Sequence, residues 1–145
     1  MVDSFGNVSS CCVCPLCPNW RKHIVEVFKL CASIKPNIIF IDDDFRYHNH
    51  SPLIWGGCFC DLHLKVMSER VGRKREELVE KALKPGKSHP YRKIWLDIFH
   101  EGLVSLATEL RNAVKSVSKD TKLGLMCSDP TVHAAKVPLL LKELD

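Results

Sequence analysis

Hydrophobic residues recur at helical spacing in four stretches of the chain, and two shorter apolar runs have the length of strands. Steps of three and four residues indicate amphipathic helices, whereas a short unbroken run of β-preferring residues is typical of a buried strand that is covered on both faces. The predicted helices run from Pro18 to Ile34, from Asp61 to Gly72, from Arg73 to Leu83 and from Pro90 to Ser118, and the predicted strands are Ile38–Ile41 and Lys122–Cys127.

The order of these elements is that of βα units in a parallel sheet. Two strands are too few for a stable parallel sheet whose faces are covered by several helices. We therefore predict an α/β fold, a partial (β/α)8 TIM barrel in which parallel strands alternate with helices. Residues 1–13 would be an irregular lead-in and residues 14–145 the partial barrel domain. Missing chain or association into a homo-oligomer would complete the barrel.

Three carboxylates, Asp42, Asp43 and Asp44, directly follow the first predicted strand. In α/β proteins ligands bind at the carboxyl ends of parallel strands, and burying carboxylates without partners is costly. The triplet is therefore the main candidate for a binding or catalytic site. The alternative is a solvated strand end, at which Asp42 accepts backbone hydrogen bonds.

Cysteine and histidine residues cluster in two short segments. Cys58, Cys60 and His63 lie within six residues, and Cys14 and Cys17 form a Cys-x-x-Cys just before the first helix. Zinc is held tetrahedrally by thiolate and imidazole, so ligands from both segments would tie the two loops together. Four protein ligands leave no place for a water, which makes the predicted site structural. The alternative is a set of free, partly buried thiols.

Composition favours a soluble, cytoplasmic protein with reduced cysteines. The chain has 145 residues, of which 46% are hydrophobic, so it can bury a core. It shows neither an export signal nor an apolar run of the ~20 residues that cross a bilayer. The formal charge of +4 is spread along the chain, with one short basic cluster at Arg73, Lys74 and Arg75. We therefore expect neither a membrane nor a nucleic acid as partner.

Three segments in series resemble the family 42 glycoside hydrolases, the zinc-containing β-galactosidases. They are CPLCPNWR before a helix, IDDDFRYH at the end of a strand, and GCFCDLHLKVM, and the resemblance covers about residues 11–71. In that family a Cys-Pro motif, an Asn-Glu pair and a Cys-x-Cys-Asp-x-Cys motif follow one another in this order. Matched position by position, Cys14, Cys58 and Cys60 fall on metal-binding cysteines, and His63 stands where the family has a further cysteine.

The same resemblance assigns roles to the carboxylates. Asp44 falls on the glutamate that is the family's general acid/base, and Asp43 falls on its substrate-contacting asparagine. Arg46 could pair with one of these carboxylates, and His48 and Trp55 in the following loop could touch a sugar. A retaining glycosidase also needs a second carboxylate ~5–5.5 Å away. Asp129 is the one local candidate, although the family places its nucleophile elsewhere.

Two functional hypotheses follow. The first is a portion of a glycoside hydrolase that acts on a β-galactoside-type carbohydrate, with Asp44 as proton donor and a structural zinc, incomplete and inactive alone. The second is a zinc-stapled α/β module with a binding or structural role and no catalysis.

Overall fold

The computed structural model describes residues 1–47, 50–53, 58–72, 74–83, 89–126, 142 and 144–145. Within them the hydrophobic pattern predicted the helices and strands well, because each begins and ends within a few residues of its expected position. The elements are α1 (Pro18–Ser33), β1 (Ile38–Ile41), α2 (Asp61–Val71), α3 (Arg75–Leu83), α4 (Pro90–Val117) and β2 (Lys122–Leu125).

Local chemistry sets several of these boundaries. Prolines occupy the first turn of α1 and of α4, where their lack of an N–H leaves no hydrogen bond unmade. The His89 imidazole accepts a hydrogen bond from the Tyr91 backbone N–H and so caps α4. Gly72 ends α2 in the left-handed conformation, at a φ of 65°, with its N–H bonded to the Ser68 carbonyl. Asp61, at which the predicted helix begins, is the first helical residue of α2, and its negative charge interacts favourably with the positive end of the helix dipole.

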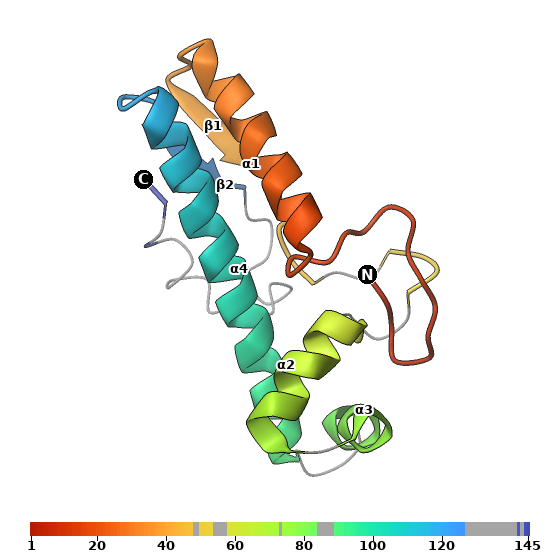
Figure 1. Ribbon diagram of the computed structural model, residues 1–145. Coiled ribbons are helices and arrows are strands. Elements are labelled where there is room, and N and C mark those ends of the chain that lie inside the picture. The colour runs from red at the N-terminus through yellow and green to blue at the C-terminus, as the bar shows by residue number, and fades with distance from the viewer. Residues whose placement is uncertain (48–49, 54–57, 73, 84–88, 127–141, 143) are drawn as a thin grey trace.

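The 28-residue helix α4 is the centre of the fold. Helices α1, α2 and α3 and strand β2 all pack against it, and Figure 1 shows α1 and the two strands along one half of α4 and α2 and α3 at the other end. Its buried face repeats at three- and four-residue steps, as the sequence pattern predicted. The buried residues of α4 are Trp95, Ile98, Phe99, Gly102, Leu103, Leu106, Ala107, Leu110, Ala113 and Val114.

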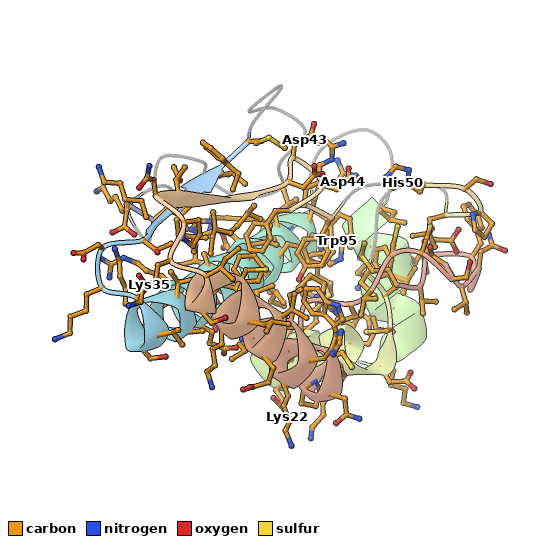
Figure 2. The ribbon with its side chains drawn as sticks, turned by 90° about the horizontal axis from the view of Figure 1, so that it is seen from above. Lys22, Lys35, Asp43, Asp44, His50 and Trp95 are labelled. Atoms are coloured by element: carbon orange, nitrogen blue, oxygen red, sulfur yellow. The ribbon has the colours of Figure 1, made fainter. Side chains whose placement is uncertain are left out.

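Strands β1 and β2 form a two-stranded parallel sheet, in which Ile38 pairs with Lys122 and Ile41 with Leu125. Figure 2 shows the strands as a layer on one side of the helices. Ile41 is buried, whereas Phe40 on the opposite face is 56% exposed. The expectation that β1 is covered on both faces is therefore wrong for the described residues.

The prediction of a partial (β/α)8 TIM barrel is also wrong. A barrel closes eight tilted strands, whereas the described residues contain one sheet of two four-residue strands. Helices α2 and α3 pack on α4 and on each other. Met67 of α2 and Leu78 of α3 are fully buried in this way. These helices therefore need no further strand to cover their apolar sides. The periodicity predicted that each helix has an apolar side, but it did not reveal which element would cover that side.

The first nine residues are irregular but tied to the rest of the chain. Val2 and Val8 form an antiparallel bridge. The buried Asp3 carboxylate accepts hydrogen bonds from the backbone N–H groups of Phe5 and Asn7. Among the described residues, none of the helices combines the length and the hydropathy that crossing a bilayer requires.

Candidate metal centre

Four side chains from two distant segments meet beside the N-terminus of α2. Cys14, Cys58, Cys60 and His63 each offer one ligand atom, and all four atoms lie within 4.8 Å of one another. The Cys14 sulfur is 3.5 Å from the Cys60 sulfur, and His63 Nδ1 is 3.4 Å from both. This cluster could hold a metal ion. The convergence of the two segments was predicted from their spacing, and Cys14 rather than Cys17 takes part.

The start of α2 places two of these groups side by side. Cys60 is the N-cap residue of α2, and His63 lies three residues further on, so both side chains project from the same side of the first turn. The Cys60 carbonyl accepts the first helical hydrogen bond, from Leu64 N–H, at 3.0 Å. The Cys60 sulfur makes no cap hydrogen bond and is directed into the cluster instead.

The His63 ring is held in place by two aromatic residues. Its Nε2 lies 2.9 Å from the Tyr47 hydroxyl, and both residues are buried. Tyr47 stacks on Phe99 with ring centroids 3.9 Å apart, and His63 meets both rings edge-on. When Nδ1 binds a metal ion, the imidazole proton lies on Nε2 and is donated to Tyr47. Tyr47 would then hold the orientation of the His63 ring through this hydrogen bond.

Tyr47 was not predicted to belong to this site. A general signal existed, since a buried tyrosine needs a partner for its hydroxyl. Burial raises the pKa of Tyr47 above its usual value, so the hydroxyl stays neutral. Gly102 on α4 leaves room for it, because a Cβ there would lie 2.9 Å from the Tyr47 oxygen.

The sulfur atoms interact strongly with one another. Hydrogen bonds from Cys14 and Cys58 lower the pKa of Cys60, whereas hydrogen bonds to Cys58 and Cys60 raise the pKa of Cys14. The first negative charge thus collects on Cys60 and opposes ionisation of its neighbours. A bound cation would offset this repulsion between thiolates, because its positive charge stabilises all of them together.

Two sets of hydrogen bonds hold the ligand-bearing loops. Val2 N–H donates to the Cys58 sulfur at 3.2 Å, and the Val2 carbonyl accepts from Phe59 N–H at 2.8 Å. On the other side, Arg21 donates to the Pro15 carbonyl at 2.6 Å, next to Cys14. The same guanidinium donates to the Gly102 carbonyl on α4 and forms an ion pair with Glu109. The Cys14 loop is therefore fixed to α4 independently of any metal.

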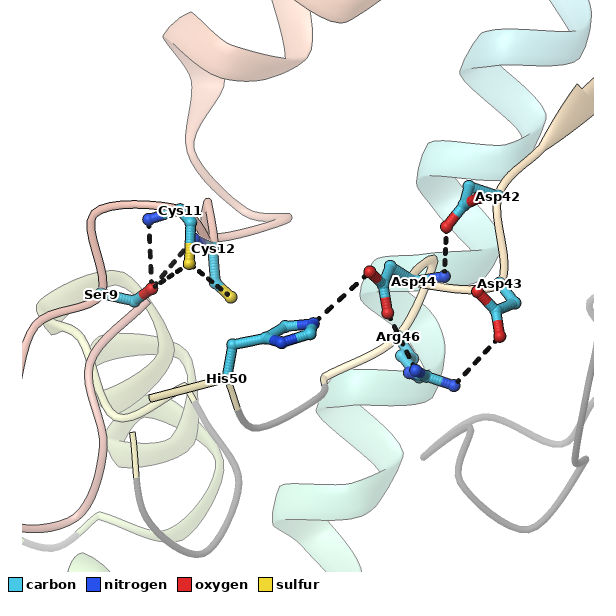
Figure 3. A network of polar contacts seen from close by, with 8 residues as sticks. All are labelled: Ser9, Cys11, Cys12, Asp42, Asp43, Asp44, Arg46 and His50. Carbon is cyan, nitrogen blue, oxygen red and sulfur yellow. Dashed lines mark hydrogen bonds and ion pairs between the residues drawn. The ribbon is translucent and has the colours of Figure 1, made fainter. Parts of the chain in front are cut away.

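The three carboxylates after β1 form a second polar cluster (Figure 3). Asp42 accepts a hydrogen bond from Asp44 N–H at 3.1 Å, which confirms its predicted role at the strand end. Arg46 forms an ion pair with Asp44 at 2.8 Å and lies 3.7 Å from Asp43, so the predicted pairing of Arg46 is also confirmed. His50 Nε2 lies 3.4 Å from the second Asp44 oxygen. Asp44 is therefore engaged by two basic side chains.

A pocket of about 720 Å³ opens beside these carboxylates, between α1, β1, α4 and the loop before α1. It has an aromatic and aliphatic wall and a polar rim, which is the usual make-up of a small-molecule site. Trp20 is only partly buried and lines this wall. The wall includes Trp20, Ile24, Phe28, Phe40 and Leu106, and the rim includes Asp42, Asp44, Arg46 and His50.

The remaining predicted site residues, His48, Trp55 and Asp129, lie outside the described residues, as do Arg73 and the side chain of Arg75. No disulfide joins the seven described cysteines. The pocket brings Asp44 and Arg46 to one rim, whereas Asp43 is not among the residues that line it.

Comparisons of the chain with models of protein families, with curated proteins and with solved structures gave no match. The resemblance to family 42 glycoside hydrolases therefore stays a prediction.

Proposed function

We propose that the protein is a zinc-stapled α/β module that binds a carbohydrate in the pocket beside Asp44. The observation that carries the zinc assignment is the convergence of three sulfurs and one imidazole nitrogen. Three thiolates and a histidine are a usual donor set for structural zinc, whereas hard cations such as Mg²⁺ and Ca²⁺ prefer oxygen ligands.

The separations among three of the four ligand atoms, those of Cys14, Cys60 and His63, fit a zinc tetrahedron. Bond lengths of about 2.3 Å to sulfur and about 2.05 Å to nitrogen give tetrahedral edges of about 3.8 Å between sulfurs and about 3.6 Å between sulfur and nitrogen. The separations are 3.5 Å between the Cys14 and Cys60 sulfurs and 3.4 Å from His63 Nδ1 to each. An expansion of a few tenths of an ångström would admit the ion.

The zinc role is structural. Four protein ligands leave no open position for a water or a substrate. Cys14, Cys58 and His63 are buried, which further separates the ion from solvent. The ion would tie the loop before α1 to the start of α2, which lie more than 40 residues apart in the sequence. Metal-binding free energy would then add directly to the free energy of unfolding.

The pocket supports a carbohydrate as the ligand. A sugar ring presents an apolar face of C–H groups and a rim of hydroxyls, and the pocket offers Trp20 and Phe28 beside charged hydrogen-bonding groups. The Arg46 Nε is buried and has no hydrogen-bond partner among the described residues. Because an unsatisfied buried donor is costly, a ligand hydroxyl that accepts from Arg46 would be bound favourably.

Two measurements test this function. Metal analysis of the purified protein should find one zinc per chain, lost in Cys58→Ser and retained in Cys31→Ser, whose cysteine is exposed on α1. Titration with methyl β-galactoside, followed by NMR, should shift pocket resonances in the wild type and in Lys22→Ala, an exposed change on α1, but not in Arg46→Ala. Absence of zinc would refute the structural zinc site, and absence of sugar binding in a zinc-loaded protein would refute the binding role.

Hydrolysis is the second candidate, because Asp42 and Asp44 both line the pocket and carboxylate oxygens of the triplet lie within 4.8 Å of one another. A retaining mechanism would need two carboxyl groups ~5–5.5 Å apart. As a proton donor, Asp44 would have to give up its ion pair with Arg46, which favours binding over catalysis. Release of nitrophenol from a nitrophenyl β-galactoside, abolished by Asp44→Asn, would show that the protein is a hydrolase and not only a binding protein.

A further inference from the structure

A pair of adjacent cysteines, Cys11 and Cys12, lies outside the metal centre and is not used by the proposed function. Both line the pocket from the loop that precedes Cys14. Cys11 is exposed, and Cys12 is partly buried. Figure 3 shows the two thiols together with Ser9 as a compact polar group. The sulfurs are 3.8 Å apart.

The hydrogen bonds of Ser9 decide which of the two sulfurs accepts a hydrogen bond from its neighbours. The Ser9 oxygen accepts hydrogen bonds from the backbone N–H groups of Cys11, at 3.2 Å, and Cys12, at 3.0 Å. A hydroxyl has two acceptor positions and one hydrogen, so both acceptor positions are used. Its hydrogen is left for the Cys11 sulfur, 3.3 Å away. The Cys12 thiol can donate to the same sulfur when Cys11 is ionised.

Two donors therefore converge on the Cys11 sulfur. The hydrogen bonds from Ser9 and then from Cys12 lower the pKa of Cys11 below its usual value. The thiolate is the form of cysteine that attacks disulfides, and exposure gives a reagent access to it. Cys31, the other exposed cysteine, has no such pair of donors among the described residues. Cys14 and Cys58 are buried in the metal centre.

We propose that Cys11 is a modification site for small disulfides, with which its thiolate exchanges to form a mixed disulfide at the wall of the pocket. In this step the Cys11 sulfur attacks one sulfur of the reagent, and the reagent's S–S bond breaks. One half of the reagent remains bonded to Cys11. The other half leaves as a thiolate and takes up a proton, so Cys11 is oxidised and the released thiol is the reduced product.

The mixed disulfide should persist rather than close onto Cys12. Adjacent Cα atoms are about 3.8 Å apart. Disulfides usually join Cα atoms about 4.4–6.8 Å apart, so a Cys11–Cys12 bond would be strained. The strain disfavours attack by Cys12 and leaves the adduct in place until an external thiol reduces it. Since both cysteines line the pocket, the adduct would narrow the space available to a ligand.

The test uses the full chain with its metal retained, treated at neutral pH with 2-hydroxyethyl disulfide as a neutral probe. Intact mass and fragmentation of non-reduced peptides should locate one added half-disulfide on Cys11. Cys11→Ser should lose this fast adduct, and Ser9→Ala should slow it several-fold, because one donor to the sulfur is gone. Cys31→Ser, the matched control at an exposed cysteine, should leave the rate unchanged.

Three results would overturn the proposal. They are modification of Cys31 as fast as that of Cys11, an adduct that resides on Cys12, and an unchanged rate in Ser9→Ala. Circular dichroism and metal content of each variant show whether the fold and the metal centre are intact. The outcome does not depend on zinc being the metal or on a sugar being the ligand of the pocket.

Discussion

Removal of the Tyr47 hydroxyl should weaken metal binding without disturbing the fold. Tyr47→Phe keeps the ring that stacks on Phe99 with centroids 3.9 Å apart, and it deletes only the oxygen that lies 2.9 Å from His63 Nε2. His63 is 2% exposed, so water does not readily replace the lost partner. The imidazole N–H would remain buried and unsatisfied.

Two independent estimates give the magnitude. A buried donor left without a partner costs about 1–3 kcal/mol. Loss of a hydrogen bond to a metal-binding histidine typically lowers metal affinity by about 10–100-fold, and at about 1.4 kcal/mol per tenfold this is about 1.4–2.8 kcal/mol. The two estimates agree, so we expect a dissociation constant for zinc raised by about one to two orders of magnitude.

The assay is competition for zinc with a chromophoric chelator, combined with denaturant unfolding of the zinc-loaded protein. Tyr91→Phe is the matched control, because Tyr91 is partly buried and lies at the start of α4, outside the metal centre. If Tyr47→Phe binds zinc as tightly as the wild type, Tyr47 does not orient His63. An equal loss in Tyr91→Phe would likewise show that the effect is not specific to the site.

Three further predictions concern the packing around the centre. Gly102→Ala should lower the free energy of unfolding by about 1–3 kcal/mol and weaken zinc binding, because the new Cβ would lie 2.9 Å from the Tyr47 oxygen. Thermal unfolding with and without a chelator measures both effects. Arg21→Ala should cost about 1–3 kcal/mol, since the Pro15 and Gly102 carbonyls lose their donor, and Arg21→Lys should recover only part of this in denaturant titrations. The hydrogen bond from Arg70 lowers the pKa of Glu101 below the usual 4.5, so this pair contributes stability above that pH and loses it as the pH falls through the lowered pKa. Both side chains are more than a third exposed, so Glu101→Gln should cost less than about 1 kcal/mol at neutral pH and flatten the acid limb of the stability profile.

The convergence of the metal ligands was predicted because it depends on residue type and spacing. Cys60 and His63 are three residues apart at a helix start, so helical geometry alone brings them together. Tyr47 was not assigned to the centre, because its contact with His63 depends on the close approach of α4 at Gly102. The grouping of Ser9, Cys11 and Cys12 was not predicted, because it rests on backbone hydrogen bonds in a loop without periodicity.

The barrel prediction failed for a related reason. Periodicity shows that α2 and α3 each have an apolar side, but that side can be covered by a sheet or by another helix with the same sequence signal. In the structure α4 covers both. The same ambiguity affected β1, whose apolar run suggested two covered faces although Phe40 is exposed.

The sequence by itself determined the helices, the strands and the two segments that supply the candidate metal ligands, because these follow from local backbone preferences, spacing and ligand chemistry. The tertiary structure alone decided which surfaces of those elements meet. It made α4 the common partner of three helices, placed Tyr47 against His63, and set Cys11 beside the pocket. Such contacts join residues far apart in the chain, and their energies depend on how well the shapes and hydrogen bonds of both partners fit.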